Sequence, residues 1–122
     1  MNNLIQAKLI ANHLISQAKQ WKELCDKREK NEMVSELDPT SGFYIDGPAN
    51  PGKIALEIKK QINDLEPELL DAVLTEISEI SKEADKGIEA NGGSLHCDAG
   101  ITKIACNQIQ GFYEMSQDTP TA

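Results

Sequence analysis

The stretch LEPELLDAVLTEISEISKEADKGIEANGG, residues 65–93, is the clearest amphipathic helix in the sequence and decides the fold class. Its apolar residues recur at spacings of three and four, which places them on one face of a helix with 3.6 residues per turn. They are Leu70, Val73, Ile77, Ile80, Ala84 and Ile88. At 1.5 Å per residue the helix would be roughly 35 to 40 Å long, about the width of a small domain. Its apolar face therefore needs a partner surface across the whole fold.

Capping residues mark both ends of this helix. Asn63 followed by Glu66 fits a capping box, and Pro67 lies in the first turn, where a missing N–H costs nothing. Residues 91–93, Asn-Gly-Gly, tolerate the left-handed conformation at a helix C-cap. We expect a helix over residues 66–90.

Upstream, residues 3–34 predict one long N-terminal helix. Small and apolar residues repeat in 3-4-3-4 spacing, the pattern of a coiled-coil seam, and its alanines would let a neighbouring helix approach closely. The seam residues are Leu4, Ala7, Ala11, Leu14, Ala18, Trp21 and Cys25. Ile5 and Leu9 lie on the opposite side of the helix. They predict contact with a second subunit, the alternative being a helix end covered by the chain's own tail.

Turn-forming residues are concentrated in the segment that follows, at about residues 36–52. This composition predicts a long loop, and loops longer than about 12 to 15 residues are usually functional or disordered. Residues 43–45, Phe-Tyr-Ile, predict either a short strand or a hydrophobic plug on the bundle.

Two further helices are expected. Asn50 as cap and Pro51 at the first helical position predict a helix over residues 51–64. Another helix is expected over residues 98–115, where Gly111 costs up to about 1 kcal/mol.

The expected fold is all-α, an irregular four-helix bundle with a long N-terminal helix and a long loop between the first two helices. We expect the first and third helices to form the long antiparallel pair. The helices form a single domain over residues 1–115, followed by a polar tail at residues 116–122.

Composition narrows the possible partners. The chain of 122 residues has 20 acidic and 12 basic residues and a formal charge of −8, which argues against direct binding to nucleic acid or anionic lipid and favours a basic protein partner. Three cysteines without framework spacing, and the lack of a signal-peptide pattern, predict reduced thiols and a cytoplasmic location. Apolar runs of two or three residues predict no membrane span.

Residues 47–53, GPANPGK, match the first seven positions of the phosphate-binding pattern G-x-x-x-x-G-K, between a possible strand and a helix. Ile54 stands where the pattern has the Ser or Thr that holds magnesium, and two prolines remove N–H groups that would cradle phosphate. The segment therefore predicts either a turn that caps a helix or a site for a nucleotide-like anion at an oligomer interface. The residues of that site would be Tyr44, Gly47, Asn50, Gly52 and Lys53.

The second candidate site is acidic. Residues 64–98 contain ten acids and only two lysines, and Glu76, Glu79 and Glu83 share one flank of the helix. Three such carboxylates resemble the magnesium ligands of all-helical nucleotide pyrophosphatases, but a second helix would have to supply matching acids. The alternatives are a solvated face or a surface that binds a basic protein.

No catalytic, metal-ligating or cofactor-binding set is expected. His13, His96 and the three cysteines match no zinc spacing, and no acid is placed to orient a Cys-His pair. The sequence thus favours a small acidic non-enzymatic binding protein, such as an inhibitor, an antitoxin-like protein or an adaptor. It would engage a basic partner through the flank formed by Glu76, Glu79 and Glu83, and it would form homo-oligomers.

Overall fold

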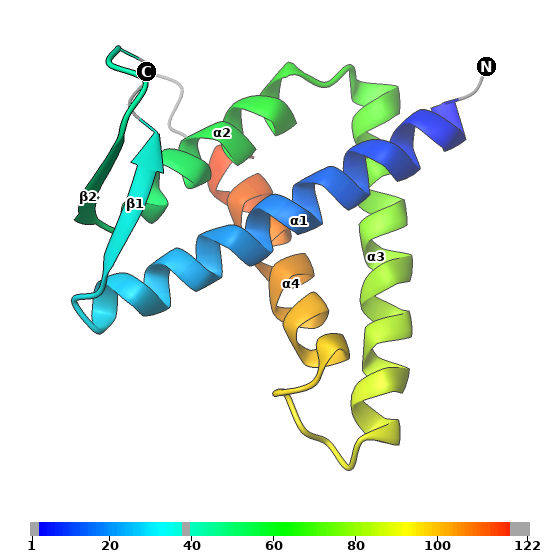
Figure 1. Cartoon of the computed structure of the whole chain (residues 1–122). Coiled ribbons are helices and arrows are strands. Elements are labelled where there is room, and N and C mark those ends of the chain that lie inside the picture. Colours follow the sequence, from blue (N-terminus) through cyan, green and yellow to red (C-terminus); the bar gives the residue numbers. More distant parts are fainter. Residues whose placement is uncertain (1–2, 38–39, 118–122) are drawn as a thin grey trace.

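The computed structural model describes residues 3–37 and 40–117, in which four helices form an irregular bundle and a two-stranded hairpin projects to one side (Figure 1). The helices are α1 (Asn3–Glu29), α2 (Pro51–Asp64), α3 (Pro67–Ala90) and α4 (Asp98–Gln117), and the strands are β1 (Met33–Leu37) and β2 (Tyr44–Pro48). The predicted all-α four-helix fold with a long N-terminal helix is confirmed. Of the predicted polar tail, residues 118–122 lie outside the described residues.

The N-terminal helix ends earlier than the predicted residue 34. Asn31 adopts a φ of 58°, which is the left-handed conformation. Among residue types, glycine adopts this conformation most readily at the end of a helix, and asparagine is the next most common. Its N–H donates to the carbonyl of Arg28 at 3.1 Å, and the N–H of Glu32 donates to that of Lys27 at 2.8 Å. These two bonds form a Schellman motif that stops α1 and turns the chain into β1.

Most of the predicted loop at about residues 36–52 is an antiparallel hairpin, so the loop prediction is wrong there. Met33 pairs with Pro48 and Leu37 with Tyr44. Of the two alternatives for residues 43–45, the short strand is thus the closer one. Strand β2 leads through two residues into α2, which begins at the predicted Asn50 cap and Pro51.

The core lies against the small-residue face of α1. Ala7, Ala11, Leu14 and Ala18 are fully buried, and α1 contacts each of the other three helices. The remaining fully buried large side chains come from the three helices that cover it. They are Ile58, Val73, Ile77, Cys106 and Ile109. Alanine at these α1 positions brings the helix backbones close together, which explains how one helix contacts three others.

Two interactions tie the C-terminal half of α1 to its neighbours. The ring of Trp21 meets the ring of Phe112 in α4 edge to face, with centroids 5.6 Å apart. The amide of Gln61 in α2 donates to Gln17 in α1 at 2.7 Å. Aromatic pairs in this geometry add about 0.5–1.5 kcal/mol to what their buried area contributes.

Helices α3 and α4 are antiparallel neighbours, whereas α1 crosses α3 obliquely (Figure 1). The prediction that the first and third helices form the antiparallel pair is therefore wrong. The N–H of Gly93 donates to the carbonyl of Ile88 at 2.8 Å and that of Gly92 to Glu89 at 3.1 Å, a Schellman motif that ends α3 as predicted. Because this turn is short, α4 must return beside α3.

The start of α3 differs from the predicted capping box. Asn63 belongs to α2, and the N-cap of α3 is Glu66, with Pro67 at the first helical position. The Glu66 side chain makes no capping hydrogen bond. Proline alone therefore marks this helix start, since its fixed φ suits the first turn and it has no N–H to satisfy.

Two glycines of α4 should respond to alanine in opposite directions. A Cβ on Gly111 meets no atom within 4 Å, so Gly111→Ala should stabilise the fold by about 0.5–1 kcal/mol through helix propensity. A Cβ on Gly100 would collide with the backbone of Leu95, so Gly100→Ala should destabilise the fold by about 1–3 kcal/mol. Urea unfolding followed by circular dichroism measures both changes. Equal shifts of the same sign in the two variants would contradict the packing of α4.

Candidate functional site

The acidic flank, defined as Glu76, Glu79 and Glu83, lies on α3 beside its buried stripe. The side chains of Glu79 and Glu83 are 62 % and 74 % exposed, and Glu76 is half-buried. Glu79 pairs with Lys82 at 3.7 Å and Glu83 with Lys86 at 3.3 Å. These pairs join residues three apart on one exposed helix face and contribute only about 0.3–0.5 kcal/mol each. A basic partner could therefore replace the lysines at little cost.

The other flank of α3 is bound to α4 by hydrogen bonds from Lys103. The ammonium group of Lys103 donates to the hydroxyl of Ser81 at 2.8 Å and to Asp85 at 3.1 Å. Ser81 is buried, with 8 % of its surface exposed. Sequence reasoning missed this contact because it joins residues 18 and 22 positions apart. It engages Asp85 in a contact with α4, whereas the ion pairs of Glu79 and Glu83 stay within α3.

The predicted anion site is partly assembled at the start of α2. Asn50, Gly52 and Lys53 line an open concavity of about 500 Å³, together with Leu56 and Lys59. Lys53 in the first turn of α2 suits an anionic ligand, whereas Lys59 lies further along the helix and its ammonium is 5.6 Å from the centroid of the Phe112 ring. Lys59 was missed because a spacing of six residues places it about 120° around the helix axis from Lys53.

Two predicted members of the anion site lie elsewhere. Gly47 is in β2, opposite Val34, and Tyr44 begins the same strand with 73 % of its surface exposed. Neither residue lines the concavity. Because β2 extends to Pro48, only two residues separate strand from helix, too few for a loop that wraps around a phosphate.

The N-terminal half of α1 exposes the predicted apolar face. Ile5 is 58 % and Leu9 66 % exposed, and Leu4 of the seam is 55 % exposed as well. A contact between subunits at this face stays a prediction. Within the described residues, no helix combines the length and the apolar character that a membrane crossing requires.

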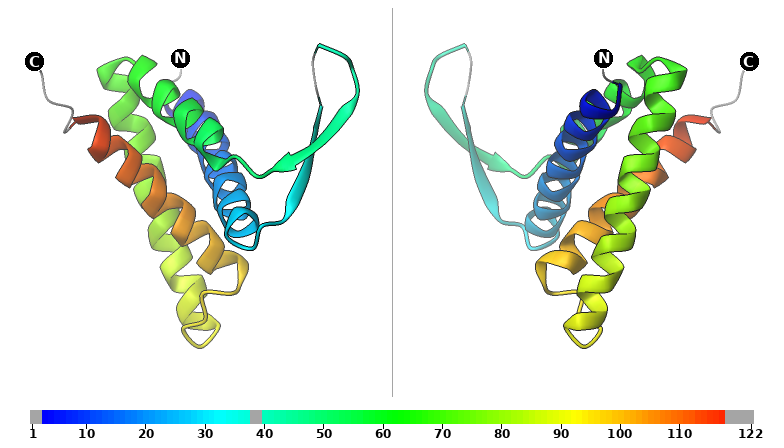
Figure 2. Two further views of the ribbon diagram at one scale, coloured as in Figure 1. Left: turned by 90° about the vertical axis from the view of Figure 1, so that its left-hand side faces the viewer. Right: turned by 90° about the vertical axis from the view of Figure 1, so that its right-hand side faces the viewer.

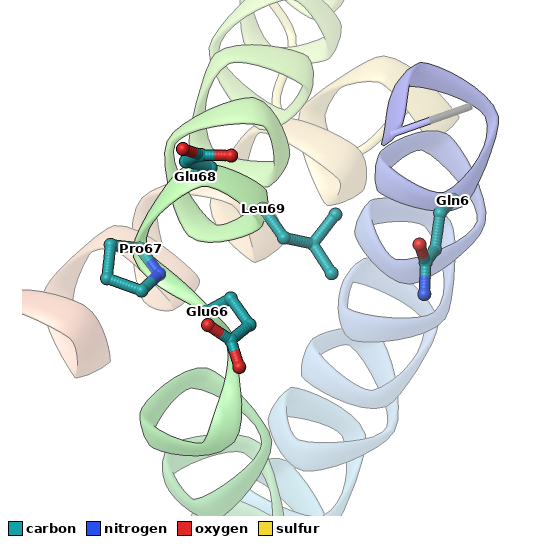
Figure 3. Close-up of a pocket in the computed structure, with 5 residues that line it drawn as sticks. All are labelled: Gln6, Glu66, Pro67, Glu68 and Leu69. Carbon is teal, nitrogen blue, oxygen red and sulfur yellow. The ribbon is translucent and has the colours of Figure 1, made fainter. Parts of the chain in front are cut away.

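A notch that the sequence did not indicate lies where α1 meets the start of α3 (Figure 3). It has a volume of about 520 Å³ and is bordered by Glu66, Pro67 and Glu68 on one side and Gln6 on the other. Leu69 projects between the two helices. The two carboxylates on the border of this notch would favour a basic group, the same partner chemistry as the acidic flank.

The cysteines are separate thiols. Cys106 is buried, while Cys25 and Cys97 are half-buried, and the Cys97 thiol donates to the carbonyl of Ser94 at 3.3 Å. Across residues 3–37 and 40–117, no three His, Cys, Asp or Glu side chains gather closely enough to hold a metal ion. The described residues therefore lack the carboxylate set that the pyrophosphatase hypothesis requires.

No protein-family model, curated protein or solved structure matches the chain.

Burial of Cys106 predicts a pH dependence of stability. Burial raises the pKa of the Cys106 thiol, an effect that Lys103 and Lys19 partly offset. The folded chain therefore keeps this proton to higher pH than the unfolded chain, so the free energy of unfolding should fall as pH rises above about 8.5. Urea unfolding in reducing buffer at several pH values measures this fall.

The matched variant is Cys106→Ala, which has no thiol to titrate at this position. Its stability should fall less between about pH 8 and pH 10 than that of the parent chain. Parallel curves for the two proteins would show that Cys106 contributes nothing to the pH dependence.

Proposed function

We propose that the chain is a small non-enzymatic binding protein that engages a basic protein partner through the acidic flank of α3. The observation that carries the proposal is that Glu79 and Glu83 are exposed on a helix and pair with Lys82 and Lys86 of the same helix, with half-buried Glu76 on the same flank. A rigid, preformed surface costs little to order on binding. An inhibitor, an antitoxin-like protein or an adaptor in the cytoplasm fits this surface.

Charge distribution supports the proposal. Helix α3 contains seven acidic and two basic residues, whereas α1 and α2 together contain eight basic and five acidic ones. The net negative charge is therefore gathered around α3 and not spread over the whole surface. Such a field speeds association with a positively charged partner and makes its rate depend on ionic strength.

Replacing Glu76, Glu79 and Glu83 together by Gln tests the proposed function. The partner is first captured from a cell lysate on the immobilised protein at low salt and is then purified and titrated by calorimetry. The triple variant should bind about three- to a hundredfold more weakly, because each exposed ion pair contributes about 0.2–1 kcal/mol. Its affinity should also depend less on salt.

A matched control removes the same charge elsewhere. Glu29, Glu32 and Glu57 are exposed and lie outside α3, so their joint replacement by Gln should leave most of the affinity intact. Equal weakening by both triple variants would mean that only net charge matters. Unchanged binding of the α3 variant at every salt concentration would refute the acidic flank as the binding surface.

A second candidate function is the binding of a nucleotide-like anion, because Lys53 and Lys59 border one concavity with the N-terminus of α2. The Asn50 side chain makes no capping hydrogen bond to the first turn of α2. The first N–H groups of the helix are thus not capped by that side chain, and they point toward the side where an anion would lie.

Lys53→Ala tests this candidate by thermal unfolding with added ATP, ADP or inorganic phosphate. A ligand that binds the folded chain raises the melting temperature, and loss of the Lys53 ammonium should abolish that rise. Lys60→Ala is the control, since Lys60 is exposed on the same helix but does not line the concavity. No rise in the parent chain, or the same rise in the Lys53 variant, would exclude this function.

A further inference from the structure

The turn between α3 and α4 forms one end of the bundle, away from the hairpin (Figure 2). It begins with Asn91, the C-cap of α3, which is followed by Gly92. No other asparagine in the sequence precedes a glycine. Glycine has no Cβ, so its backbone nitrogen is open to close approach by a neighbouring group. This dipeptide is therefore where the backbone of the chain is most able to react with a side-chain amide.

The reaction is deamidation through a cyclic imide. The backbone nitrogen of Gly92 loses its proton to solvent and forms a bond to Cγ of Asn91, which closes a five-membered ring. The bond from Cγ to Nδ2 breaks, and Nδ2 takes up a proton from water and leaves as ammonia. Water then hydrolyses the ring at either carbonyl carbon, which leaves aspartate or isoaspartate at position 91. Water is the only other reactant.

Solvent has access to this turn. The side chain of Asn91 is exposed, and so are the two glycines that follow it. A Cβ built on Gly92 or Gly93 would meet no atom within 4 Å. Water can therefore reach both the backbone nitrogen that loses its proton and the ring that is later hydrolysed.

The folded turn holds both reacting groups in other bonds. Nδ2 of Asn91 donates to the carbonyl oxygen of Gly87 at 2.8 Å, which fixes the side chain against the last turn of α3. The N–H of Gly92 donates to the carbonyl oxygen of Glu89 at 3.1 Å. The proton of a hydrogen-bonded amide is protected from exchange with solvent until the bond opens. Both bonds therefore oppose the reaction.

The backbone of Asn91 also keeps the two groups apart. Its ψ is 25°, so in rotation about the Cα–C bond the nitrogen of Gly92 lies close to the backbone nitrogen of Asn91 and away from Cβ. Ring closure needs that nitrogen on the side of Cβ, where it can reach Cγ. The last turn of α3 must therefore open before the ring can form. Helix ends open locally at a small fraction of the free energy of global unfolding, so the folded chain reaches this state.

Deamidation would weaken the end of α3. A carboxylate at position 91 has no N–H to donate, so the bond to the carbonyl of Gly87 would be lost. Its negative charge would also lie at the C-terminus of a helix, where the macrodipole disfavours it. Gly87 packs closely on α4, since a Cβ built on it would lie 2.7 Å from Cβ of Ala99. The weakened end of α3 thus lies beside its packing contact with α4.

We propose that Asn91 is a site of spontaneous deamidation and that the C-cap of α3 controls its rate. Opening of the last turn of α3 allows Gly92 to attack, and the product keeps the turn weakened, so the modification accumulates with the age of the molecule. This inference is independent of the acidic flank and of the anion site, because neither the reaction nor its control involves their residues.

The first test follows the full chain at physiological pH and temperature. Samples taken over several weeks are digested at mildly acidic pH, and mass spectrometry of the peptides distinguishes acid from amide at each asparagine. Conversion should be fastest at Asn91. A parallel sample unfolded in guanidinium chloride should convert Asn91 roughly five- to thirtyfold faster than a folded sample at the same ionic strength, which corresponds to about 1–2 kcal/mol for opening of the turn.

A cap variant isolates the role of the turn. Gly93 has a φ of 83°, and its N–H donates to the carbonyl of Ile88 in the Schellman motif. Alanine is strained in this left-handed conformation, so Gly93→Ala should convert Asn91 roughly five- to thirtyfold faster in the folded chain. The added Cβ meets no atom within 4 Å, so the rest of the fold should not change. In guanidinium chloride the variant and the parent chain should convert Asn91 at the same rate.

Asn91→Asp reproduces one product of the reaction. It should lower the melting temperature by about 2–5 °C, because it removes the bond to Gly87 and adds a charge at the helix end. Asn107→Asp is the matched control, since Asn107 is exposed within α4 and not at its end, and it should lower the melting temperature less. Asn91→Gln keeps an amide but closes the ring far less readily, so it should show no conversion at this position.

Three results would overturn the proposal. The first is conversion at Asn91 no faster than at the other asparagines of the chain. The second is an equal rate of conversion in the folded and the unfolded chain, which would mean that the cap does not protect Asn91. The third is a Gly93→Ala variant that is folded by circular dichroism and converts Asn91 no faster than the parent chain.

Discussion

Close packing on the small-residue face of α1 is the constraint on which the rest of the structure depends. Three alanines on this face are fully buried, so the backbones of three other helices can reach the same helix. A larger side chain at any of these positions would push one neighbour away and open the core on the other side. The organising element is therefore α1, although α3 has the stronger amphipathic pattern, because α1 touches every other helix.

This arrangement also separates the charges of the molecule. Helix α3 presents its acidic flank to one side, while α1 and α2 hold most of the basic residues beside the hairpin. Figure 2 shows α1 between the hairpin on one side and α3 and α4 on the other. The acidic residues are thus concentrated on α3, and the basic residues on α1 and α2. Such polarity favours specific orientation over nonspecific adhesion.

Local patterns predicted the elements far better than the contacts between them. The stripe around Val73 and Ile77, the Asn50-Pro51 start and the glycine stop of α3 all depend on residues within a few positions, so the sequence indicates them directly. The hairpin depends on pairing Met33 with Pro48, fifteen residues apart, and no local pattern specifies that register.

In the candidate site, too, the sequence indicated the local pattern but not the contacts between elements. The helical spacing of the three glutamates could be read from the sequence. The hydrogen bonds of Lys103 to Ser81 and Asp85 on the other flank of α3 could not. A concavity lined by Leu24 of α1, Val34 of β1 and Ile54 of α2 was likewise not predicted, because only the packed structure brings these side chains together. Crossing of α1 over α3 was missed because periodicity identifies a buried face but not the direction of the helix that covers it.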